Sequence, residues 1–411
     1  MREMKDSGIK WIGAIPKDWR LTQARRLFNN KKEIVGDDVD KYERLALTLN
    51  GVIKRSKEDS EGLQPEKFEG YQILRKNNLV FKMIDLENVN TSRVGLSPYN
   101  GLVSPAYIVF SNNHDDNRFS YYWFMSMYYH EVFNHLGGDG VRSALNAKDM
   151  LSLPIPNISA AEQARIADYL DKKCSKIDTI IEKQQEIIEK LKEYKLSIIN
   201  EKTNVNTKVT CHLSYLGQMK NGLNFFDVDD GEKIMFLGVG DFKDYFVLDN
   251  KKMFSTITVN ENVISEELML ENGDIIFVRS NGSKELVGRA VMVDAIDFKL
   301  TYTGFAIRYR NMRRDIINSK YLLYYFRSPD FRKLLEKNSQ GSNISNMNQD
   351  LLGNIEISIP EMDYQNDTVC YLDKKCKVID KTIEKKQETI TKLLDYKKSL
   401  IYEVVTGKME V

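Results

Sequence analysis

Two segments of the chain carry hydrophobic residues at alternating spacings of three and four positions. Residues 169–204 and 371–406 both show this pattern, and neither contains glycine or proline. A spacing held for about four heptads is typical of a coiled-coil seam, because an ordinary surface helix has a wider apolar stripe. The predicted core positions are Leu170, Cys174, Ile177, Ile181, Gln184, Ile188, Leu191 and Ile198 in the first segment, and Leu372, Cys376, Ile379, Ile383, Lys386, Ile390, Leu393 and Leu400 in the second.

The two segments are copies of one sequence. Residues 169–185 read YLDKKCSKIDTIIEKQQ and residues 371–387 read YLDKKCKVIDKTIEKKQ, and 21 of the 36 aligned positions are identical. Each helix is the obvious partner of the other, and an antiparallel pair would place Gln184 and Lys386 in neighbouring layers, where they could fix the register. Pairing between molecules fits the pattern equally well. The proline-marked approaches before the helices suggest Ser159 and Asp363 as helix N-caps.

The remainder of the chain has the composition of mixed α/β globules. Strand-like runs include NNLVFKMI and AYIVF in the first half, and KIMFLGVG, GDIIFVRS, GRAVMV and FAIRYR in the second. The aromatic segments FSYYWFMSMYYHEVF and KYLLYYFRSPDFRKLL predict helices, and their spacing favours core packing over base stacking. We therefore expect an α+β, mixed α/β protein with a pseudo-twofold repeat. Its predicted segments are a first globule at 1–153, a helical spacer at 154–204, a second globule at 205–359 and a second spacer at 360–411.

Composition narrows the class of protein only slightly. The net charge is +1, from 60 basic and 59 acidic residues, so any nucleic-acid contact must depend on local placement of cations. No apolar run is long enough for a membrane span, and the N-terminus lacks the apolar core of a signal peptide. We expect a cytoplasmic protein with four reduced cysteines and no membrane partner.

Catalytic motifs are missing from the sequence. The four histidines have no zinc-site spacing, and there is no Walker A loop or G-x-S-x-G elbow. GVGD at 238–241 is better explained as a strand end or turn than as a dinucleotide-binding fingerprint. DDGEK at 229–233 is better explained as a turn between strands than as a set of nuclease carboxylates. The sequence therefore predicts no active site, no metal and no bound cofactor.

Polar and basic loop residues are the better candidates for function. Arg suits guanine edges, Asn and Gln suit adenine edges, and Lys and Ser suit phosphates. Such residues recur just upstream of both long helices, although each loop alone is also what an ordinary solvated turn looks like. The DNA-binding candidates are Lys82, Arg93, Arg142, Ser143, Asn146 and Lys148 in the first half, and Arg279, Asn281, Lys284, Arg289, Gln340, Ser342, Asn343 and Asn346 in the second.

The chain resembles the specificity (S) subunit of type I restriction–modification systems. The resemblance rests on the opening KDSGIKWIGAIPKDWRL, the approach PIPNISAAEQARIADYLD, the seam IDTIIEKQQEIIEKLKEYKLSII and the ending SLIYEVVTGK. The two copies differ in the approach before the helix, where the second copy has Tyr364 in place of Glu162. The resemblance implies two target-recognition domains, each reading half of a split site in double-stranded DNA, held apart by an antiparallel pair of helices.

The resemblance also implies a division of labour. The S subunit would be non-catalytic, and it would dock two modification subunits that methylate adenine with S-adenosylmethionine and two restriction subunits that use ATP and Mg²⁺. Helices of about 36 residues would span about 54 Å, which predicts half-sites about one helical turn or slightly more apart. A coiled-coil protein scaffold and a cryptic nuclease are the alternatives.

Overall fold

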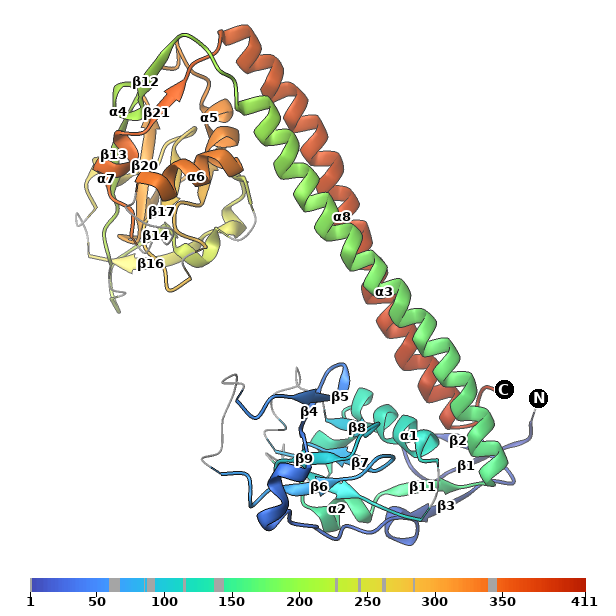
Figure 1. Cartoon of the computed structure of the whole chain (residues 1–411). Coiled ribbons are helices and arrows are strands. Elements are labelled where there is room, and N and C mark those ends of the chain that lie inside the picture. The colour runs from blue at the N-terminus through green and yellow to red at the C-terminus, as the bar shows by residue number, and fades with distance from the viewer. Residues whose placement is uncertain are drawn as a thin grey trace. The chain divides into compact units, whose positions relative to one another are not determined.

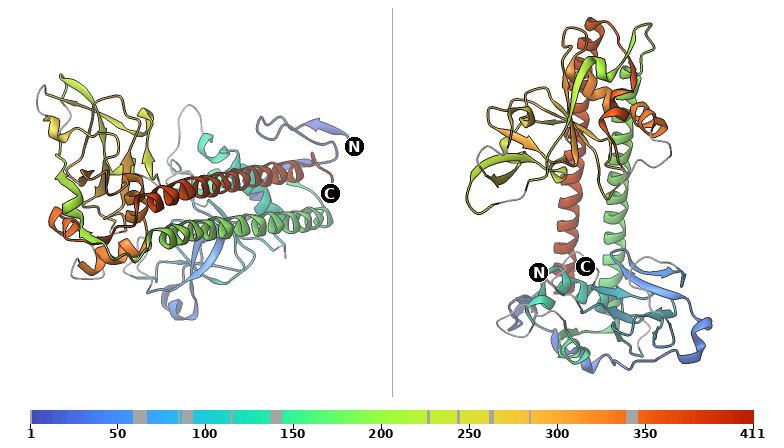
Figure 2. Two further views of the ribbon diagram at one scale, coloured as in Figure 1. Left: turned by 90° about the horizontal axis from the view of Figure 1, so that it is seen from above. Right: turned by 90° about the vertical axis from the view of Figure 1, so that its left-hand side faces the viewer.

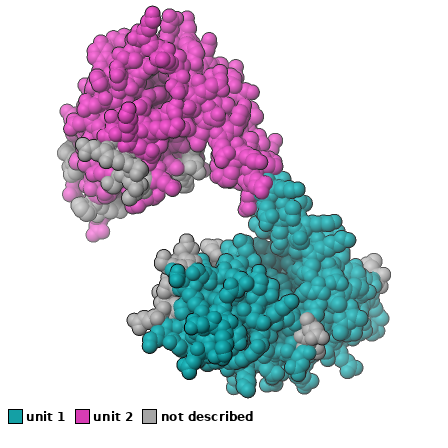
Figure 3. Space-filling model, viewed as in Figure 1, with its two compact units in different colours: residues 1–184, 388–411 teal, residues 185–387 magenta. Residues whose placement is uncertain are grey.

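The computed structural model describes residues 2–58, 67–84, 86, 93–113, 116–136, 144–225, 228–242, 245–260, 264–283, 285–338 and 346–411. The chain divides into two compact units (Figure 3). Unit 1 comprises residues 1–184 and 388–411, and unit 2 comprises residues 185–387. Each unit therefore contains one globule together with half of each long helix.

The two predicted long helices are present and are longer than the heptad pattern indicated. They are α3 (Ala160–Thr203) and α8 (Met362–Val405), both visible in Figure 1. Ser159 accepts a hydrogen bond from the Glu162 N–H at 3.2 Å, as expected of an N-cap. The prediction for Asp363 is wrong, because α8 begins at Met362. Asp363 lies in the first turn, where its carboxylate faces the positive end of the helix dipole.

In each unit α3 lies beside α8, as both views in Figure 2 show. Lys397 pairs with Asp178 at 2.6 Å in unit 1, and Lys195 pairs with Asp380 at 2.7 Å in unit 2. The start of one helix therefore faces the end of the other, which makes the pair antiparallel. Both lysines interrupt the apolar pattern, and each pair maps onto the other by the 202-residue repeat.

The predicted core positions lie along the seam. Gln184, Lys386, Leu191, Ile383, Ile390 and Leu393 are half-buried. The buried positions are Leu170, Cys174, Ile177, Ile181, Ile188, Ile198, Leu372, Cys376, Ile379 and Leu400. Burial raises the pKa of the Cys174 and Cys376 thiols to about 11, so both side chains pack as small apolar groups.

The globule of unit 1 is built from short strands over an aromatic core. Its four-stranded sheet has the order β5 (Gly51–Arg55), β4 (Arg44–Thr48), β9 (Gly101–Val103), β6 (Gln72–Leu74). Its three-stranded sheet has the order β10 (Ile108–Phe110), β7 (Leu79–Phe81), β8 (Val94–Leu96). Two further antiparallel pairs are β1 (Met4–Asp6) with β2 (Ala14–Pro16) and β3 (Arg20–Gln23) with β11 (Pro154–Asn157).

Helices α1 (Arg118–Tyr129) and α2 (Ala147–Leu151) complete this globule, with 3₁₀ turns η1 (Ala24–Arg26), η2 (Gly36–Lys41) and η3 (Val132–His135). The aromatic side chains of α1 pack into the core: Phe124 is fully buried against Phe81 and Phe110, and Trp123 is fully buried against Trp11. Core packing was the favoured interpretation of this aromatic segment, and it is confirmed.

The last residues of the chain complete unit 1. The Tyr402 hydroxyl donates to the Ile12 carbonyl at 2.9 Å, and Ile401 and Val405 lie in the same hydrophobic core as Trp19. Gly407 has φ +71°, and a Cβ there would overlap the ring of Pro16. The two ends of the chain are therefore packed against each other.

Unit 2 repeats the plan with longer strands. Its five-stranded sheet has the order β13 (Gly217–Asn221), β20 (Ala306–Asn311), β17 (Ile275–Val278), β18 (Ala290–Val293), β15 (Val247–Leu248). Its three-stranded sheet has the order β16 (Ser255–Val259), β14 (Glu232–Leu237), β19 (Leu300–Tyr302), and β12 (Thr210–His212) pairs with β21 (Glu356–Ser358).

The short helices of unit 2 are α4 (Leu213–Leu216), α5 (Ser319–Phe326), α6 (Pro329–Asn338) and α7 (Gln349–Gly353), with 3₁₀ turns η4 (Val239–Asp241), η5 (Lys251–Met253) and η6 (Glu266–Leu268). The single helix predicted over 320–335 is divided into α5 and α6 because Pro329 cannot continue the first helix and instead begins the second. GVGD forms a turn after β14, and Asp229 and Asp230 of DDGEK lie in a bend before that strand, as predicted, whereas Glu232 and Lys233 begin the strand itself.

Candidate nucleic-acid interface

The end of a central strand meets the start of a short helix in both units, through the same backbone contact. In unit 1 the Leu145 N–H donates to the Met83 carbonyl at 2.9 Å, beyond the end of β7. In unit 2 the Met347 N–H donates to the Arg279 carbonyl at 2.9 Å, beyond the end of β17. Leu145 and Met347 are 202 residues apart, so the repeat of the helices extends to the segments that carry the candidate loops.

Unit 2 brings several predicted DNA-binding residues together at this contact. Ser280 and Asn346 form an isolated antiparallel bridge, which places Asn346 beside Arg279. Asn281 accepts a hydrogen bond from the Ser283 N–H at 2.8 Å and is thereby held in a tight turn. Among the described residues, the side chains of Arg279 and Asn346 make no hydrogen bond or ion pair, so both remain available to a ligand.

We call the set formed by Arg279, Asn281, Phe305 and Asn346 the Arg279 patch. Phe305 belongs to it because its carbonyl accepts the Arg279 N–H at 2.8 Å. Arg289 is adjacent, since its carbonyl accepts the Val278 N–H at 2.9 Å. The sequence did not indicate Phe305, because a single phenylalanine at the start of a strand-like run is indistinguishable from a core residue.

Unit 1 uses its candidates differently. Asn146 is the N-cap of α2 and forms a capping box with Asp149, accepting the N–H groups of Lys148 and Asp149 at 2.8 and 3.0 Å. The Lys148 side chain is exposed, and Lys82 is half-buried. Asn348, at the repeat position of Asn146, also caps its helix, α7, by accepting the Leu351 N–H at 2.7 Å.

Arg93 has a structural role. Only 2% of its surface is exposed, and its guanidinium donates to the carbonyls of Lys82 at 3.3 Å and Ile84 at 2.6 Å. A buried cation is tolerated when its donors are satisfied in this way. We therefore assign Arg93 to positioning the strand end rather than to contacting a ligand. The candidates Arg142, Ser143, Lys284, Gln340, Ser342 and Asn343 lie outside the described residues.

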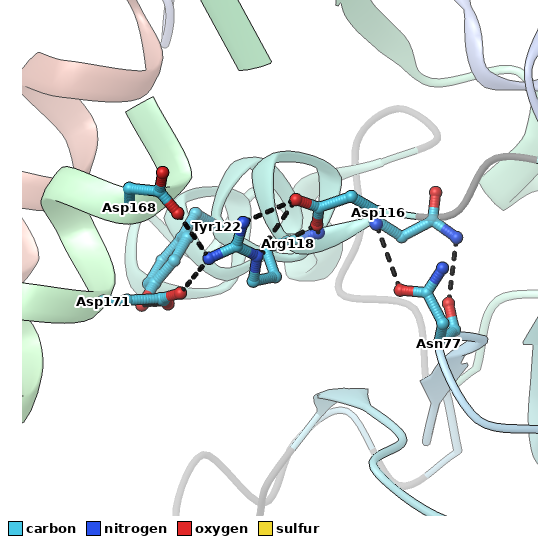
Figure 4. Close-up of polar contacts among 7 residues, drawn as sticks. Asn77, Asp116, Arg118, Tyr122, Asp168 and Asp171 are labelled. Atoms are coloured by element: carbon cyan, nitrogen blue, oxygen red, sulfur yellow. Dashed lines mark hydrogen bonds and ion pairs between the residues drawn. The ribbon is translucent and has the colours of Figure 1, made fainter. Parts of the chain in front are cut away.

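A polar clamp joins the globule of unit 1 to its long helix (Figure 4). Arg118, at the start of α1, pairs with Asp168 at 2.8 Å and with Asp171 at 2.6 Å on α3, and also with Asp116 at 2.6 Å. The Tyr122 hydroxyl donates to Asp171 at 2.7 Å. The hydrogen bonds from Arg118 hold the pKa of Asp116 below its ordinary value, so the carboxylate remains charged.

Unit 2 contains the same clamp in the same positions of the repeat. Lys320 pairs with Asp373 at 2.7 Å, and the Tyr324 hydroxyl donates to Asp373 at 2.7 Å. Burial raises the pKa of the Tyr324 hydroxyl, as it does for Tyr122, so both remain neutral donors. Sequence reasoning missed these residues. The repeat did carry a signal for them. Tyr122 and Asp171 recur as Tyr324 and Asp373 at the 202-residue offset, and the cation Arg118 recurs as the cation of Lys320.

Each unit therefore contains a globule that is clamped to a long helix through the same repeat positions, together with the same backbone contact between a strand end and the start of a short helix. No His, Cys, Asp or Glu cluster in the described ranges could hold a metal ion. Within the same ranges, no helix combines the length and apolar character needed to cross a membrane.

Comparison with known proteins identifies the family. A model of the type I restriction modification DNA specificity domain matches residues 28–193 and 213–392, one match in each half. The chain belongs to this family.

Two relatives are specificity subunits of type I restriction enzymes. The StySPI subunit of Salmonella potsdam is 24% identical over 314 residues, which cover 71% of this chain and 65% of the relative. The EcoKI subunit of Escherichia coli strain K12 is 24% identical over 253 residues, which cover 57% of this chain and 52% of the relative. The matched regions thus span less than two thirds of either relative.

The fold matches a solved structure from work described as "Structural basis underlying complex assembly and conformational transition of the type I R-M system". The TM-score is 0.70 with 14% sequence identity, and the match covers 96% of this chain and 99% of the other. At this identity the similarity concerns the fold.

Proposed function

We propose that this chain is the DNA sequence-specificity subunit of a type I restriction–modification complex, and that each globule reads one half of a bipartite site in double-stranded DNA. The observation that carries the proposal is the repeated contact between a strand end and a polar loop, Met83 with Leu145 and Arg279 with Met347. Two matches to a DNA specificity family model, one per half, support the same conclusion.

In this proposal the coiled coil acts as a ruler, because its length sets the distance between the two half-sites. The functional segments are the recognition domains 1–153 and 205–359 and the spacers 154–204 and 360–411. A helix of 44 residues corresponds to about 66 Å, and we expect half-sites centred about one helical turn or slightly more apart. The clamps at Asp171 and Asp373 fix each recognition domain to its helix, so helix length is converted into DNA spacing.

Catalysis belongs to partner subunits in this proposal. Two modification subunits would methylate adenine with S-adenosylmethionine, and two restriction subunits would use ATP and Mg²⁺, while this chain binds no cofactor and works in the cytoplasm. A pseudo-twofold coil supports paired docking, because Tyr194 and Tyr396 are exposed at equivalent positions of the repeat. The names of the relatives indicate the kind of system in which this chain would work. The symmetry of the coil is the reason to expect two copies of each partner subunit.

The test is to co-express the chain with the modification subunit encoded beside it and to map methylated adenines across the host genome. A single split motif with a fixed gap is the expected result. A stable complex without methylation would contradict the reading function, and the absence of any complex would favour a protein scaffold instead. Inserting one helical turn into both α3 and α8 should widen the gap, and an unchanged gap would refute the ruler.

A further inference from the structure

Phe305 is an exposed aromatic residue in the middle of the Arg279 patch. Its surface is 51% exposed, in a turn between β19 and β20. Leu223, which is bridged to Thr303 of the same turn, is 46% exposed. Single exposed apolar residues are common on protein surfaces, but here two lie on adjoining backbone segments next to the polar candidates.

The turn that carries Phe305 is held in place by its backbone. The Phe305 N–H donates to the Thr303 hydroxyl at 3.3 Å, and its carbonyl accepts the Arg279 N–H. At Gly304 an added Cβ would lie 2.7 Å from the side-chain oxygen of Asn224, so the chain passes too closely there for a larger residue. The ring is therefore presented outward by a fixed turn.

The surroundings of the ring favour DNA as its ligand. Arg279 supplies a cation with no partner among the described residues, and Asn281 and Asn346 supply amide groups that suit base edges. Proteins that insert phenylalanine or leucine between base steps combine such a wedge with Arg, Lys, Asn or Gln contacts. An apolar ring flanked by a free guanidinium and amides has this composition.

At the equivalent turn unit 1 carries no aromatic ring, although Ile84, 40% exposed beside its strand end, is apolar. Ile108 pairs with Phe81 in unit 1, as Ile307 pairs with Phe277 in unit 2. Phe81 and Phe277 each lie two residues before the strand-end carbonyl described above, so they are equivalent. The equivalent of Phe305 is therefore Ala106, whose methyl group cannot stack on a base.

We propose that the Phe305 ring is a wedge that stacks against the bases of the half-site read by unit 2, and that unit 1 reads its half-site without one. The proposal rests on the proposed function. It assigns an asymmetry to a subunit that is otherwise repeated: one half-site is locally unstacked and the other remains regular.

The experiment uses the full chain co-purified with its modification subunit and duplexes carrying the motif found by methylation mapping. 2-Aminopurine is placed at each position of both half-sites, and binding is measured over a range of salt concentrations. The two methylated adenines are left out, because a methyltransferase flips its target base out of the stack; at the other positions wild-type protein should raise the fluorescence once, in one half-site only. Phe305→Ala should abolish that rise and weaken binding roughly 5- to 150-fold, as expected for loss of one base stack.

The salt dependence separates stacking from charge. Phe305→Ala should leave the slope of log K against log salt unchanged, whereas Arg279→Ala should reduce it by up to about 0.9. Phe305→Trp should retain both fluorescence and affinity, which controls for misfolding. Tyr245→Ala is the matched control, since this tyrosine is 40% exposed in the same unit outside the patch, and it should change nothing.

Normal affinity and fluorescence in Phe305→Ala would overturn the wedge while leaving the reading function intact. Equal fluorescence changes in both half-sites, at positions other than the methylated adenines, would also overturn it. Failure of the proposed function is distinguishable, because the wild-type complex would then bind no specific duplex at all.

Discussion

The ion pair between Lys195 and Asp380 allows a sharp test of how the spacer is stabilised in unit 2. The Lys195 side chain is only 13% exposed, whereas that of Asp380 is 55% exposed. The two residues should therefore respond very differently to removal of their partner. Asp380→Asn leaves a largely buried ammonium group without its carboxylate, and Lys195→Met leaves a carboxylate that water can solvate.

The expected costs follow from this difference. Loss of the carboxylate should lower the free energy of unfolding of unit 2 by about 1–2 kcal/mol, because the buried cation loses its charged acceptor. Lys195→Met restores an apolar seam position and should be close to neutral, since replacing a largely buried charge by an apolar side chain of similar size costs little and water can solvate Asp380. The double variant should resemble Lys195→Met, which gives a coupling energy of about 1–2 kcal/mol.

Calorimetry on the full chain is the assay, with the transitions of the two units followed separately. For a domain of this size, 1–2 kcal/mol corresponds to about 2–8 °C in Tm. The equivalent pair in unit 1, Asp178 with Lys397, is the matched control: Asp178→Asn should shift the other transition. If Lys195→Met proves as costly as Asp380→Asn, or if neither changes the unfolding of unit 2, the burial argument is refuted.

Three further outcomes are expected. Tyr122→Phe removes the hydrogen bond to Asp171 and should lower the free energy of unfolding of unit 1 by about 1 kcal/mol. The Tm of unit 1 should fall while the helical signal in circular dichroism stays unchanged. An unchanged Tm would mean that this hydrogen bond does not stabilise unit 1. Gly407→Ala places a Cβ at positive φ against a proline ring and should expose the N-terminal segment to limited proteolysis, whereas wild-type resistance would contradict the packing of the chain ends. Cys370 is exposed and should react with a thiol reagent at pH 8 well before Cys174, whose burial raises its pKa to about 11; equal rates would argue against a closed seam.

The periodic parts of the molecule could be predicted from the sequence and the tertiary contacts could not. Heptad spacing identified both long helices because a coiled-coil seam is a local pattern, and the strand runs around Phe277 and Phe110 were apolar enough to stand out. The 202-residue repeat also drew attention to the loops before the two long helices, because a repeat can be seen in the sequence without knowledge of tertiary contacts. The polar intrusions Lys195 and Lys397 were visible, but their partners were not.

Residues whose role depends on distant partners escaped prediction. Arg93 looks like any loop cation, and only folding shows it buried against two carbonyls. Asn146 was chosen as a base-reading amide, yet its backbone neighbours use it as a helix cap, which is the commoner fate of asparagine before a short helix. Phe305 was grouped with a strand because hydrophobicity alone cannot distinguish a core ring from an exposed one.

The packing of the two chain ends has a consequence for synthesis. Unit 2 is contiguous, so it can fold as soon as it leaves the ribosome, but unit 1 must wait for residues 388–411. At translation rates of 5–20 residues per second, roughly 10–45 s pass between completion of residue 184 and the end of the chain. During that interval the first half of α3 exposes its seam. A second nascent copy of the chain has that long to compete for it.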